Sequence, residues 1–349
     1  MHKIRVLVVD DSFFMRKIIS DILSGDPGLE VIGEAVDGND ALEKIDKLRP
    51  EVVTLDYEMP HLNGLEAFKK IVEKTNRPSV IVVSGYVKEG AEVTLKFLEA
   101  GAVDFILKPS GSLSLDMDKV GKELIEKVKI AASVDPYKKF HNQLRANTAK
   151  MLPFKKGQGV VVIGSSTGGP AALQALLPIF PEHFPLPIVV AQHLPEAFIR
   201  SFVERLAKDC QLKVVRAEDG IEINPGVIYM APGGNDTEIH MNIEKKAALR
   251  VIENTKEIET PSVNKLMTSA ADVYGEHTIG VILTGMGKDG SIGMGEIKKK
   301  GGTTLVQDKD TSVIYGMGKE VVDLGLADEI LPLDTIVEKI SEILTPPNG

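Results

Sequence analysis

Acidic, hydroxyl and lysine side chains follow a series of short apolar runs in the first third of the chain. Asp10 and Asp11 come directly after the first run, Asp56 ends the third, Ser84 ends the fourth and Lys108 follows the fifth. If these runs are parallel strands, their carboxyl ends meet at one edge of a sheet and the side chains converge on one crevice. Three carboxylates repel one another, so a proton or a divalent cation must accompany them. Oxygen ligands in incomplete number suit Mg²⁺, which keeps several waters and recruits phosphate oxygens.

The chemistry that such a pocket favours is formation of a covalent aspartyl phosphate. Asp56 would be the nucleophile, and Ser84 and Lys108 would bind the new phosphoryl oxygens. Any one of these residues alone is more often a polar cap at the end of a strand. Because they follow different strands of one predicted sheet, phosphoryl transfer is the favoured interpretation.

A second reactive pattern begins at residue 160. An apolar run at residues 160–163 leads into the sequence GSSTGGP, and a helical pattern follows. A glycine-rich turn between a strand and a helix can bind an anion through its backbone N–H groups. It can also present a serine nucleophile, as in the G-x-S-x-G pattern that Gly164, Ser166 and Gly168 satisfy. The turn alone leaves a merely structural role open as well.

Two further strand ends supply partners for a serine. A run at residues 188–192 delivers His193, and a run at residues 279–283 leads into TGMGKDG, which contains Asp289. Nucleophile, base and orienting carboxylate would then lie at the carboxyl edges of three parallel strands. A lone histidine is more often structural, but this combination favours a catalytic triad of Ser166, His193 and Asp289. The chain order Ser–His–Asp differs from that of α/β-hydrolases, which disfavours membership of that family.

The elements that must position these residues alternate along the chain. Short β-branched runs predict strands, and the segments between them carry apolar residues three or four positions apart, which is typical of amphipathic helices. The pattern favours an α/β protein with two doubly wound parallel-sheet domains. The predicted strands span residues 4–9, 31–35, 52–55, 80–83, 103–107, 160–163, 188–191, 214–215, 227–230, 279–283 and 304–306, with one hairpin around 238–252.

A basic segment separates the two series of strands. Residues 125–156 carry 8 basic and 2 acidic side chains, contain Pro136 and Pro153, and lose their helical periodicity after about residue 132. We therefore predict a first domain over residues 1–124, a linker over 125–156 and a second domain over 157–349.

The composition restricts the possible functions. The 349 residues carry 41 basic and 50 acidic side chains, a net charge of −9, which is opposite to the footprint of a nucleic-acid-binding protein. No run approaches the roughly 18 apolar residues of a membrane helix, and the apolar N-terminal stretch is too short for a signal peptide. The single cysteine, Cys210, excludes an internal disulfide. We expect a cytoplasmic protein with no nucleic-acid partner and no direct membrane insertion.

The first domain resembles the receiver domain of bacterial two-component response regulators. The resemblance rests on VVDDS at residues 8–12, LDYEMP at 55–60 and KP at 108–109. It implies a flavodoxin-like fold with Asp56 as the phospho-acceptor. The implied Mg²⁺ ligands are Asp11, Asp56 and the backbone carbonyl of Glu58, with Asp10 in a supporting position.

The same resemblance assigns a switch to this domain. Ser84 and Phe105 match the hydroxyl and aromatic positions that move when such domains are phosphorylated. Together with Lys108, they are the residues expected to bind the phosphoryl group or to respond to it.

The second domain resembles the catalytic domain of chemotaxis protein-glutamate methylesterases. The resemblance rests on residues 164–170, QHLP at 192–195, PSVNKLM at 261–267 and residues 283–290. It implies a Rossmann-like α/β fold, and a receiver followed by this domain is the arrangement of the family's full-length members. Ser165 stands where alanine is usual in the family, which leaves an adjacent serine as a rival nucleophile.

The resemblance implies a phosphorylation-regulated serine esterase of chemotactic adaptation. Its substrates would be glutamate methyl esters, and glutamines for deamidation, on the cytoplasmic domains of methyl-accepting chemoreceptors. The backbone N–H of Met286 and N–H groups near Thr167 would bind the oxyanion. A chemotaxis histidine kinase would be the phosphodonor, ester hydrolysis would need no cofactor, and we expect a monomer. The alternative is a response regulator whose second domain binds a ligand or a protein without catalysis.

Overall fold

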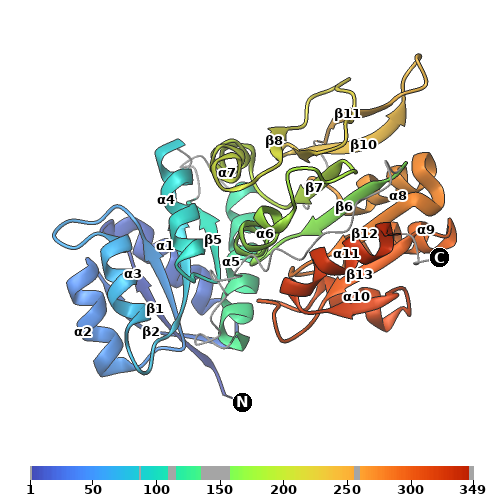
Figure 1. Cartoon of the computed structure of the whole chain (residues 1–349). Helices are drawn as coiled ribbons and strands as arrows, with labels where there is room; N and C mark the ends of the chain where they lie inside the picture. Colours follow the sequence, from blue (N-terminus) through green and yellow to red (C-terminus); the bar gives the residue numbers. More distant parts are fainter. Residues whose placement is uncertain (1, 86–87, 109–114, 135–157, 255–259, 346–349) are drawn as a thin grey trace. The chain divides into compact units, whose positions relative to one another are not determined.

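The computed structural model describes residues 2–85, 88–108, 115–134, 158–254 and 260–345. The chain divides into two compact units, Met1–Lys139 and Phe140–Gly349 (Figure 1). In the described part of the chain, no helix combines the length and the apolar character needed to cross a bilayer.

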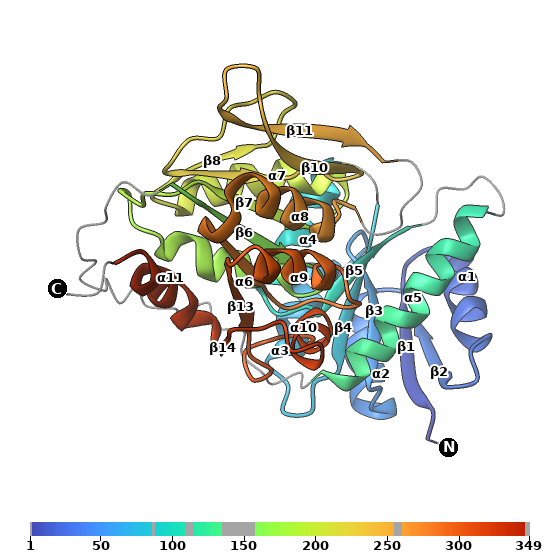
Figure 2. The same cartoon turned by 90° about the vertical axis from the view of Figure 1, so that its right-hand side faces the viewer.

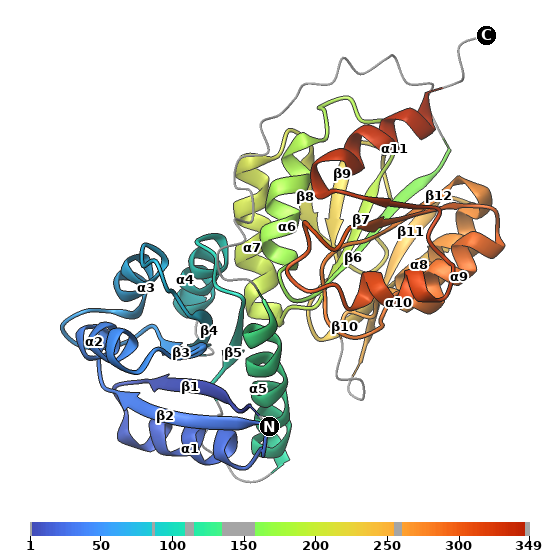
Figure 3. The ribbon, with the colours of Figure 1, turned by 90° about the horizontal axis from the view of Figure 1, so that it is seen from below.

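The first unit is a five-stranded sheet with helices on both faces. Its strand order is β2-β1-β3-β4-β5, and every neighbouring pair is parallel. Helices α1 and α5 contact each other on one face, whereas α2, α3 and α4 cover the other (Figure 3). The elements are β1 (Ile4–Val9), α1 (Phe13–Ser24), β2 (Leu29–Ala35), α2 (Gly38–Leu48), β3 (Val52–Asp56), α3 (Gly64–Val72), β4 (Ser79–Ser84), α4 (Lys88–Glu99), β5 (Asp104–Leu107) and α5 (Leu115–Ser133).

Local sequence explains how this unit places its strand ends. Every residue of β3 and β4 is buried, as expected for continuous apolar strands covered on both faces. Helices α1, α2 and α3 begin after Ser12, Asp37 and Asn63, whose side chains accept hydrogen bonds from N–H groups of the first turn. Helices α1 and α2 therefore begin within four residues of the strand before them, whereas α3 begins eight residues after β3 ends.

The second unit is a seven-stranded parallel sheet with an added hairpin. Its strand order is β14-β13-β12-β6-β7-β9-β8, and the antiparallel hairpin β10–β11 packs against α8 (Figures 1 and 2). Helices α6, α7 and α11 lie on one face of the sheet, and α8, α9 and α10 lie on the other (Figure 3). The strands are β6 (Val160–Ser165), β7 (Ile188–Gln192), β8 (Lys213–Arg216), β9 (Val227–Met230), β10 (Asn235–Met241), β11 (Ala247–Glu253), β12 (Thr278–Ile282), β13 (Thr303–Gln307) and β14 (Glu329–Leu331). The α-helices are α6 (Gly169–Leu176), α7 (Glu196–Asp209), α8 (Val263–Tyr274), α9 (Ser291–Lys299), α10 (Met317–Asp323) and α11 (Ile336–Leu344), with 3₁₀ turns η1 (Leu177–Ile179), η2 (Gly275–His277) and η3 (Leu333–Thr335).

These two sheets confirm the predicted α/β fold class, and the predicted strands and hairpin are present. The sequence did not reveal β14, a three-residue edge strand that is too short to show a period. Residues 135–156 of the predicted linker lie outside the described residues.

The predicted start of the linker needs correction, because residues 125–133 are the last turns of α5. The basic residues counted there include Lys127 and Lys129. Lys127 Nζ lies 2.8 Å from Glu123 Oε1, and Lys129 Nζ lies 2.6 Å from Asp26 Oδ2. These two lysines thus belong to a helix of the first unit and pair with its acidic residues.

Candidate active sites

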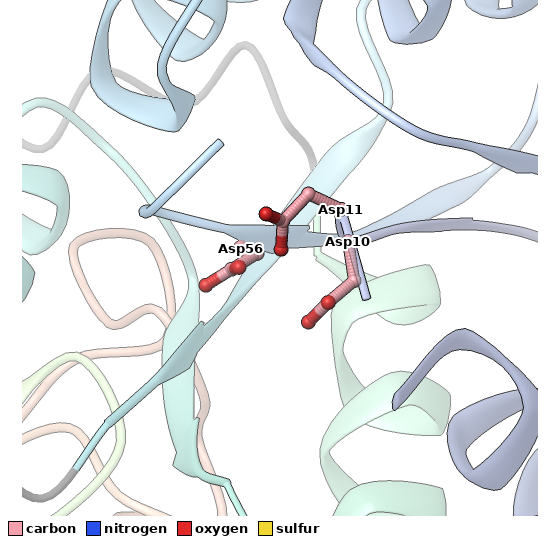
Figure 4. Close-up of side chains that lie close together, drawn as sticks. All are labelled: Asp10, Asp11 and Asp56. Carbon is pink, nitrogen blue, oxygen red and sulfur yellow. The ribbon is translucent and has the colours of Figure 1, made fainter. Parts of the chain in front are cut away.

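The carboxyl edge of the first sheet collects the predicted acidic residues. Asp10 follows β1 and Asp56 ends β3; their exposed fractions are 0% and 2%, whereas Asp11 is exposed. One carboxylate oxygen of each lies within 4.8 Å of the others. Figure 4 shows the three side chains close together beyond the ends of the strands. The structure therefore brings together the three carboxylates that the sequence predicted to converge.

Among the described residues, Lys108 faces the two buried carboxylates. Lys108 Nζ lies 2.9 Å from Asp10 Oδ2 and 2.7 Å from Asp56 Oδ2. These are ion-pair distances, but neither oxygen has a well-aligned hydrogen bond. Burial, followed by the charge of Asp10, raises the pKa of Asp56 to about 6, although Lys108 and the backbone N–H of Glu58 act in the opposite direction. The pocket therefore holds more negative charge than its one ammonium group neutralises.

The donor set of this pocket fits a divalent cation. The two buried carboxylates share the Lys108 ammonium, so their remaining negative charge is costly unless a further positive charge approaches them. An exposed third carboxylate, Asp11, leaves one side open to water. Hard oxygen ligands in incomplete number, with room for solvent, are the arrangement that suits such a cation next to a phosphoryl group. Glu58, two residues after Asp56, is exposed at the same edge.

The two predicted switch residues are buried beside this pocket. The Ser84 hydroxyl lies 2.8 Å from the Thr94 hydroxyl of α4, at hydrogen-bond distance. The Phe105 ring, 5% exposed, faces the Lys127 ammonium at 5.1 Å from the ring centroid. No pattern in the sequence points to Thr94, because a single threonine in an amphipathic helix has no distinguishing feature. The structure adds it as the partner that holds Ser84.

The second unit presents its serines on a tight turn between β6 and α6. Gly168 has a φ of +76°, and a Cβ there would lie 2.1 Å from Val313 Cγ2. A Cβ on Gly169 would lie 1.9 Å from Gln192 Oε1. Both positions exclude a side chain, so the glycines of the predicted motif are required by close packing of the turn.

The two adjacent serines differ in their burial and in their hydrogen-bond partners. Ser165 is fully buried and donates a hydrogen bond of 2.6 Å to Gln192 Oε1. Ser166 is half-buried, and its Oγ lies 3.2 Å from His193 Nδ1. Of the two serines, Ser166 therefore contacts the histidine, as its position in the G-x-S-x-G pattern predicts.

Asp289 contacts the His193 imidazole on the side opposite to Ser166. His193 Nε2 lies 2.9 Å from Asp289 Oδ2, and the carboxylate also accepts backbone N–H groups of Val263, Asn264 and Gly290 at 2.7–2.9 Å. Burial acts to raise the pKa of Asp289, but the hydrogen bonds from His193, Val263 and Asn264 lower it below its usual value. The ionised carboxylate orients the ring with Nε2–H toward itself, which leaves Nδ1 as the acceptor facing Ser166 Oγ.

The support of Asp289 comes from the start of α8. Ser262 caps the helix by accepting the Lys265 N–H, and the first two helical N–H groups point at the carboxylate, where the helix dipole favours negative charge. The Asn264 side chain also accepts the N–H groups of Gly290 and Gly293, at 3.0 and 2.9 Å. The segment at residues 261–267 resembles the methylesterase family, but its sequence alone predicted no role for it. A serine immediately before an apolar helical pattern was the available signal.

The predicted oxyanion residues flank the nucleophile. A Cβ on Gly285 would lie 3.0 Å from Ser166 Cβ, so the residue before Met286 packs directly against the serine. Thr167 follows Ser166, and its carbonyl accepts a 3.0 Å hydrogen bond from the Thr284 hydroxyl. The Ser166 N–H donates to the Thr284 carbonyl at 3.1 Å. The end of β12 and the nucleophile turn are thus bound to each other around Ser166.

Comparison with known proteins agrees with this geometry. The family model for CheB methylesterase matches residues 161–340, and the model for the response regulator receiver domain matches residues 6–116. The protein-glutamate methylesterase/protein-glutamine glutaminase of Thermotoga maritima is 44% identical over 343 residues, which cover 98% of each chain. The chain belongs to the protein-glutamate methylesterase family.

Other relatives support the same assignment across both units. The enzyme of the same name from Pyrococcus abyssi is 44% identical over 349 residues, covering 97% of this chain and 93% of the relative. The crystal structure of the Thermotoga maritima CheB methylesterase catalytic domain has 42% identity and a TM-score of 0.52, and covers 54% of this chain and 99% of that chain. The family predicted from the motifs is therefore confirmed. Its receiver domain is of the kind that is phosphorylated in the presence of a divalent metal.

Proposed function

We propose that the chain hydrolyses glutamate methyl esters on the cytoplasmic domains of chemoreceptors and deamidates glutamines there, under control of receiver phosphorylation. The observation that carries this proposal is the series Ser166 Oγ–His193–Asp289, with contacts of 3.2 and 2.9 Å at the carboxyl edge of the second sheet. The printed names of relatives 44% identical to this chain support the substrate class.

The mechanism follows from the roles of these three side chains. Ser166 Oγ attacks the ester carbonyl while His193 Nδ1 takes its proton and then delivers it to the departing methanol. Asp289 stabilises the imidazolium and keeps the ring in this orientation. Water then enters, loses a proton to His193 and releases the glutamate carboxylate together with free Ser166. Deamidation uses the same acyl-enzyme, with ammonia as the leaving group in place of methanol.

The oxyanion that forms in each half-reaction needs donors close to Ser166. We assign this role to the backbone N–H of Met286 and to N–H groups at Thr167. The packing of Gly285 against Ser166 supports the assignment, because it brings this segment to the nucleophile. Loss of one such donor typically raises the barrier by about 2.7–4 kcal/mol.

A methanol-release assay on a methylated chemoreceptor tests the esterase proposal. Ser166→Ala should abolish release, whereas the matched Ser165→Ala should still release methanol at a readily measurable rate, because of the two hydroxyls it is that of Ser166 that lies at hydrogen-bond distance from the His193 ring. Full activity of Ser166→Ala would refute the assigned nucleophile. If the wild-type chain releases no methanol with or without a phosphodonor, a binding role for the second domain replaces catalysis.

In the receiver, Asp56 accepts the phosphoryl group from a chemotaxis histidine kinase. Lys108 and Ser84 bind the phosphoryl oxygens, and Phe105 responds as the aromatic switch. Asp10, Asp11, Asp56 and the Glu58 carbonyl are the groups that would hold Mg²⁺, which when bound neutralises charge on the phosphoryl oxygens. Three carboxylates that lie within 4.8 Å of one another around the Lys108 ammonium support this assignment.

Regulation is tested on the full chain with a small phosphodonor. We expect addition of the phosphodonor and Mg²⁺ to increase methanol release by the wild type and to leave Asp56→Asn unresponsive. Equal stimulation of both proteins would contradict Asp56 as the acceptor.

The same proposal places the protein in the cytoplasm, where the substrate domains of the receptors lie, and describes it as a monomer without a nucleic-acid partner. With α5 assigned to the receiver, the linker covers about residues 135–156 and the catalytic domain begins near residue 157. Sedimentation analysis of the purified chain tests the monomer.

A further inference from the structure

Gln192 lies between the proposed nucleophile and base but is assigned no role in the chemistry. It ends β7, is 1% exposed, and makes all its polar contacts within the nucleophile turn and its own strand end. We propose that Gln192, oriented by Ser165, is a positioning residue that keeps Ser166 and His193 at reacting distance. This inference rests on the proposed function and adds a device that supports it.

The two N–H groups of the Gln192 amide bind the two residues that react. Nε2 lies 3.0 Å from the carbonyl oxygen of Ser166 and 3.1 Å from the carbonyl oxygen of His193. One planar amide group thus connects the backbone of the nucleophile to the backbone of the base. A shift of either residue away from the other breaks one of these hydrogen bonds.

Hydrogen bonds on both sides of the amide fix which way it faces. Its hydroxyl donates to Gln192 Oε1 at 2.6 Å, whereas the two carbonyls on the other side can only accept. If the amide were turned over, its oxygen would face two carbonyl oxygens, so only one orientation satisfies every partner. Gly169 permits this packing, because any side chain there would collide with Oε1.

The position of this group in the sheet explains why it is needed. Ser165 and Gln192 are the last register pair between parallel strands β6 and β7, and the His193 N–H still donates to the Ser165 carbonyl at 3.1 Å. Ser166 and His193 lie one residue beyond that pair, where the ladder ends. The Gln192 side chain therefore supplies the next connection between the segments that follow β6 and β7. It does so at the point where the reactive side chains leave the sheet.

Two variants test the two halves of this arrangement separately. Gln192→Glu keeps the acceptor that Ser165 binds but replaces both N–H donors with an oxygen that faces two carbonyls. We expect kcat for methyl ester hydrolysis to fall about 10- to 100-fold with KM changed less than about twofold, because alignment of bound groups is lost while the substrate surface stays intact. Ser165→Ala leaves both donors in place and should reduce kcat only about two- to fivefold.

A second readout follows the nucleophile without the receptor. The rate at which a fluorophosphonate labels Ser166 depends on the alignment of its hydroxyl with His193, so it should fall in parallel with kcat in Gln192→Glu. Adding Ser165→Ala to Gln192→Glu should cause little further loss, since the hydroxyl then orients a group that no longer donates.

Thr304→Val controls for a general loss of stability. Thr304 is buried at the opposite, amino edge of the sheet, and its hydroxyl donates to the Leu326 carbonyl at 2.6 Å. This variant should lower the unfolding temperature without lowering the labelling rate of the folded protein. If Gln192→Glu keeps the wild-type kcat and labelling rate, or loses them only in proportion to its unfolded fraction, the positioning role is wrong. If the wild type labels at Ser166 but releases no methanol, the proposed function fails while the labelling series still decides the role of Gln192.

Discussion

The two strand-end pockets of this chain shift the pKa of a buried carboxylate in opposite directions. Asp56 lies beside Asp10 and shares one lysine with it, and burial raises the pKa of Asp56 to about 6. Asp289 is similarly buried, but it accepts three backbone N–H groups in addition to His193, and its pKa is lowered. In the first pocket two buried carboxylates share one ammonium group, whereas in the second one carboxylate accepts hydrogen bonds from His193 and three backbone N–H groups.

This difference matches the role proposed for each pocket. A phospho-accepting carboxylate has to meet a cation and a phosphoryl group, so an excess of negative charge over the Lys108 ammonium suits that role. A hydrolytic triad has to be aligned before the ester arrives, and fixed donors that need no reorganisation serve that purpose. A buried carboxylate with few partners therefore indicates a site that takes up a ligand. A fully hydrogen-bonded carboxylate indicates a site whose side chains are aligned beforehand.

The largest expected effect concerns the fully bonded carboxylate. Asp289→Asn should lower kcat for methyl ester hydrolysis by about 10⁴-fold, because an amide cannot stabilise the imidazolium and favours the wrong ring tautomer. The matched control is Asp328→Asn, which changes a carboxylate that accepts the Thr304 N–H at the amino edge of the same sheet. The control should keep kcat within about twofold. Comparable losses in both variants would show that alignment at Asp289 is not special.

The second prediction concerns the under-bonded pocket. Mg²⁺ at 100 times its dissociation constant should stabilise the first unit by about 2.7 kcal/mol, and a chelator should reverse this. Asp10→Asn should remove most of the metal effect but stabilise the metal-free protein by about 1 kcal/mol, because it relieves repulsion with Asp56. Urea unfolding with and without Mg²⁺ measures both effects. If the metal-free Asp10→Asn protein were less stable than the wild type, repulsion between Asp10 and Asp56 would not be the dominant interaction in this pocket.

A third prediction concerns the support of Asp289. Asn264→Ala should destabilise the second unit by about 1–3 kcal/mol, because it leaves the buried N–H of Gly293 without its acceptor. Asn242→Ala is the matched control: its Oδ1 also accepts two backbone N–H groups, from Glu244 and Lys246, but in an exposed hairpin turn. Water can replace the acceptor there, so the control should cost less than about 1 kcal/mol. Calorimetric unfolding of both variants makes the comparison.

The residues that sequence could place are those fixed by strand ends. Ser166, His193 and Asp289 each follow a parallel strand, and strands of one sheet share their carboxyl edge, so convergence follows from topology alone. The residues it missed act through hydrogen bonds between distant parts of the chain. Asn264 binds Gly290 across 26 positions, and no local pattern distinguishes it from other polar residues of an amphipathic helix. The boundary of the first domain was placed before the end of α5 for a related reason, because charge counted along the sequence does not show which lysines pair with acids in space.

The last prediction uses the pH dependence of the fully bonded pocket. The pKa of Asp289 is lower in the folded protein than its usual value of 3.8, which the unfolded chain regains. Its ionised form therefore stabilises the fold above about pH 4, and this contribution is lost as the pH falls through the folded pKa. Below pH 4 the stability difference between the wild type and Asp289→Asn should shrink, since the variant has no proton to gain at this position. Hydrogen exchange of α8 amides between pH 5 and pH 3 measures the difference, because Val263 and Asn264 donate to this carboxylate. A difference that stays constant over that range would mean that the backbone donors do not hold Asp289 in its ionised form, and the contrast with Asp56 would lose its physical basis.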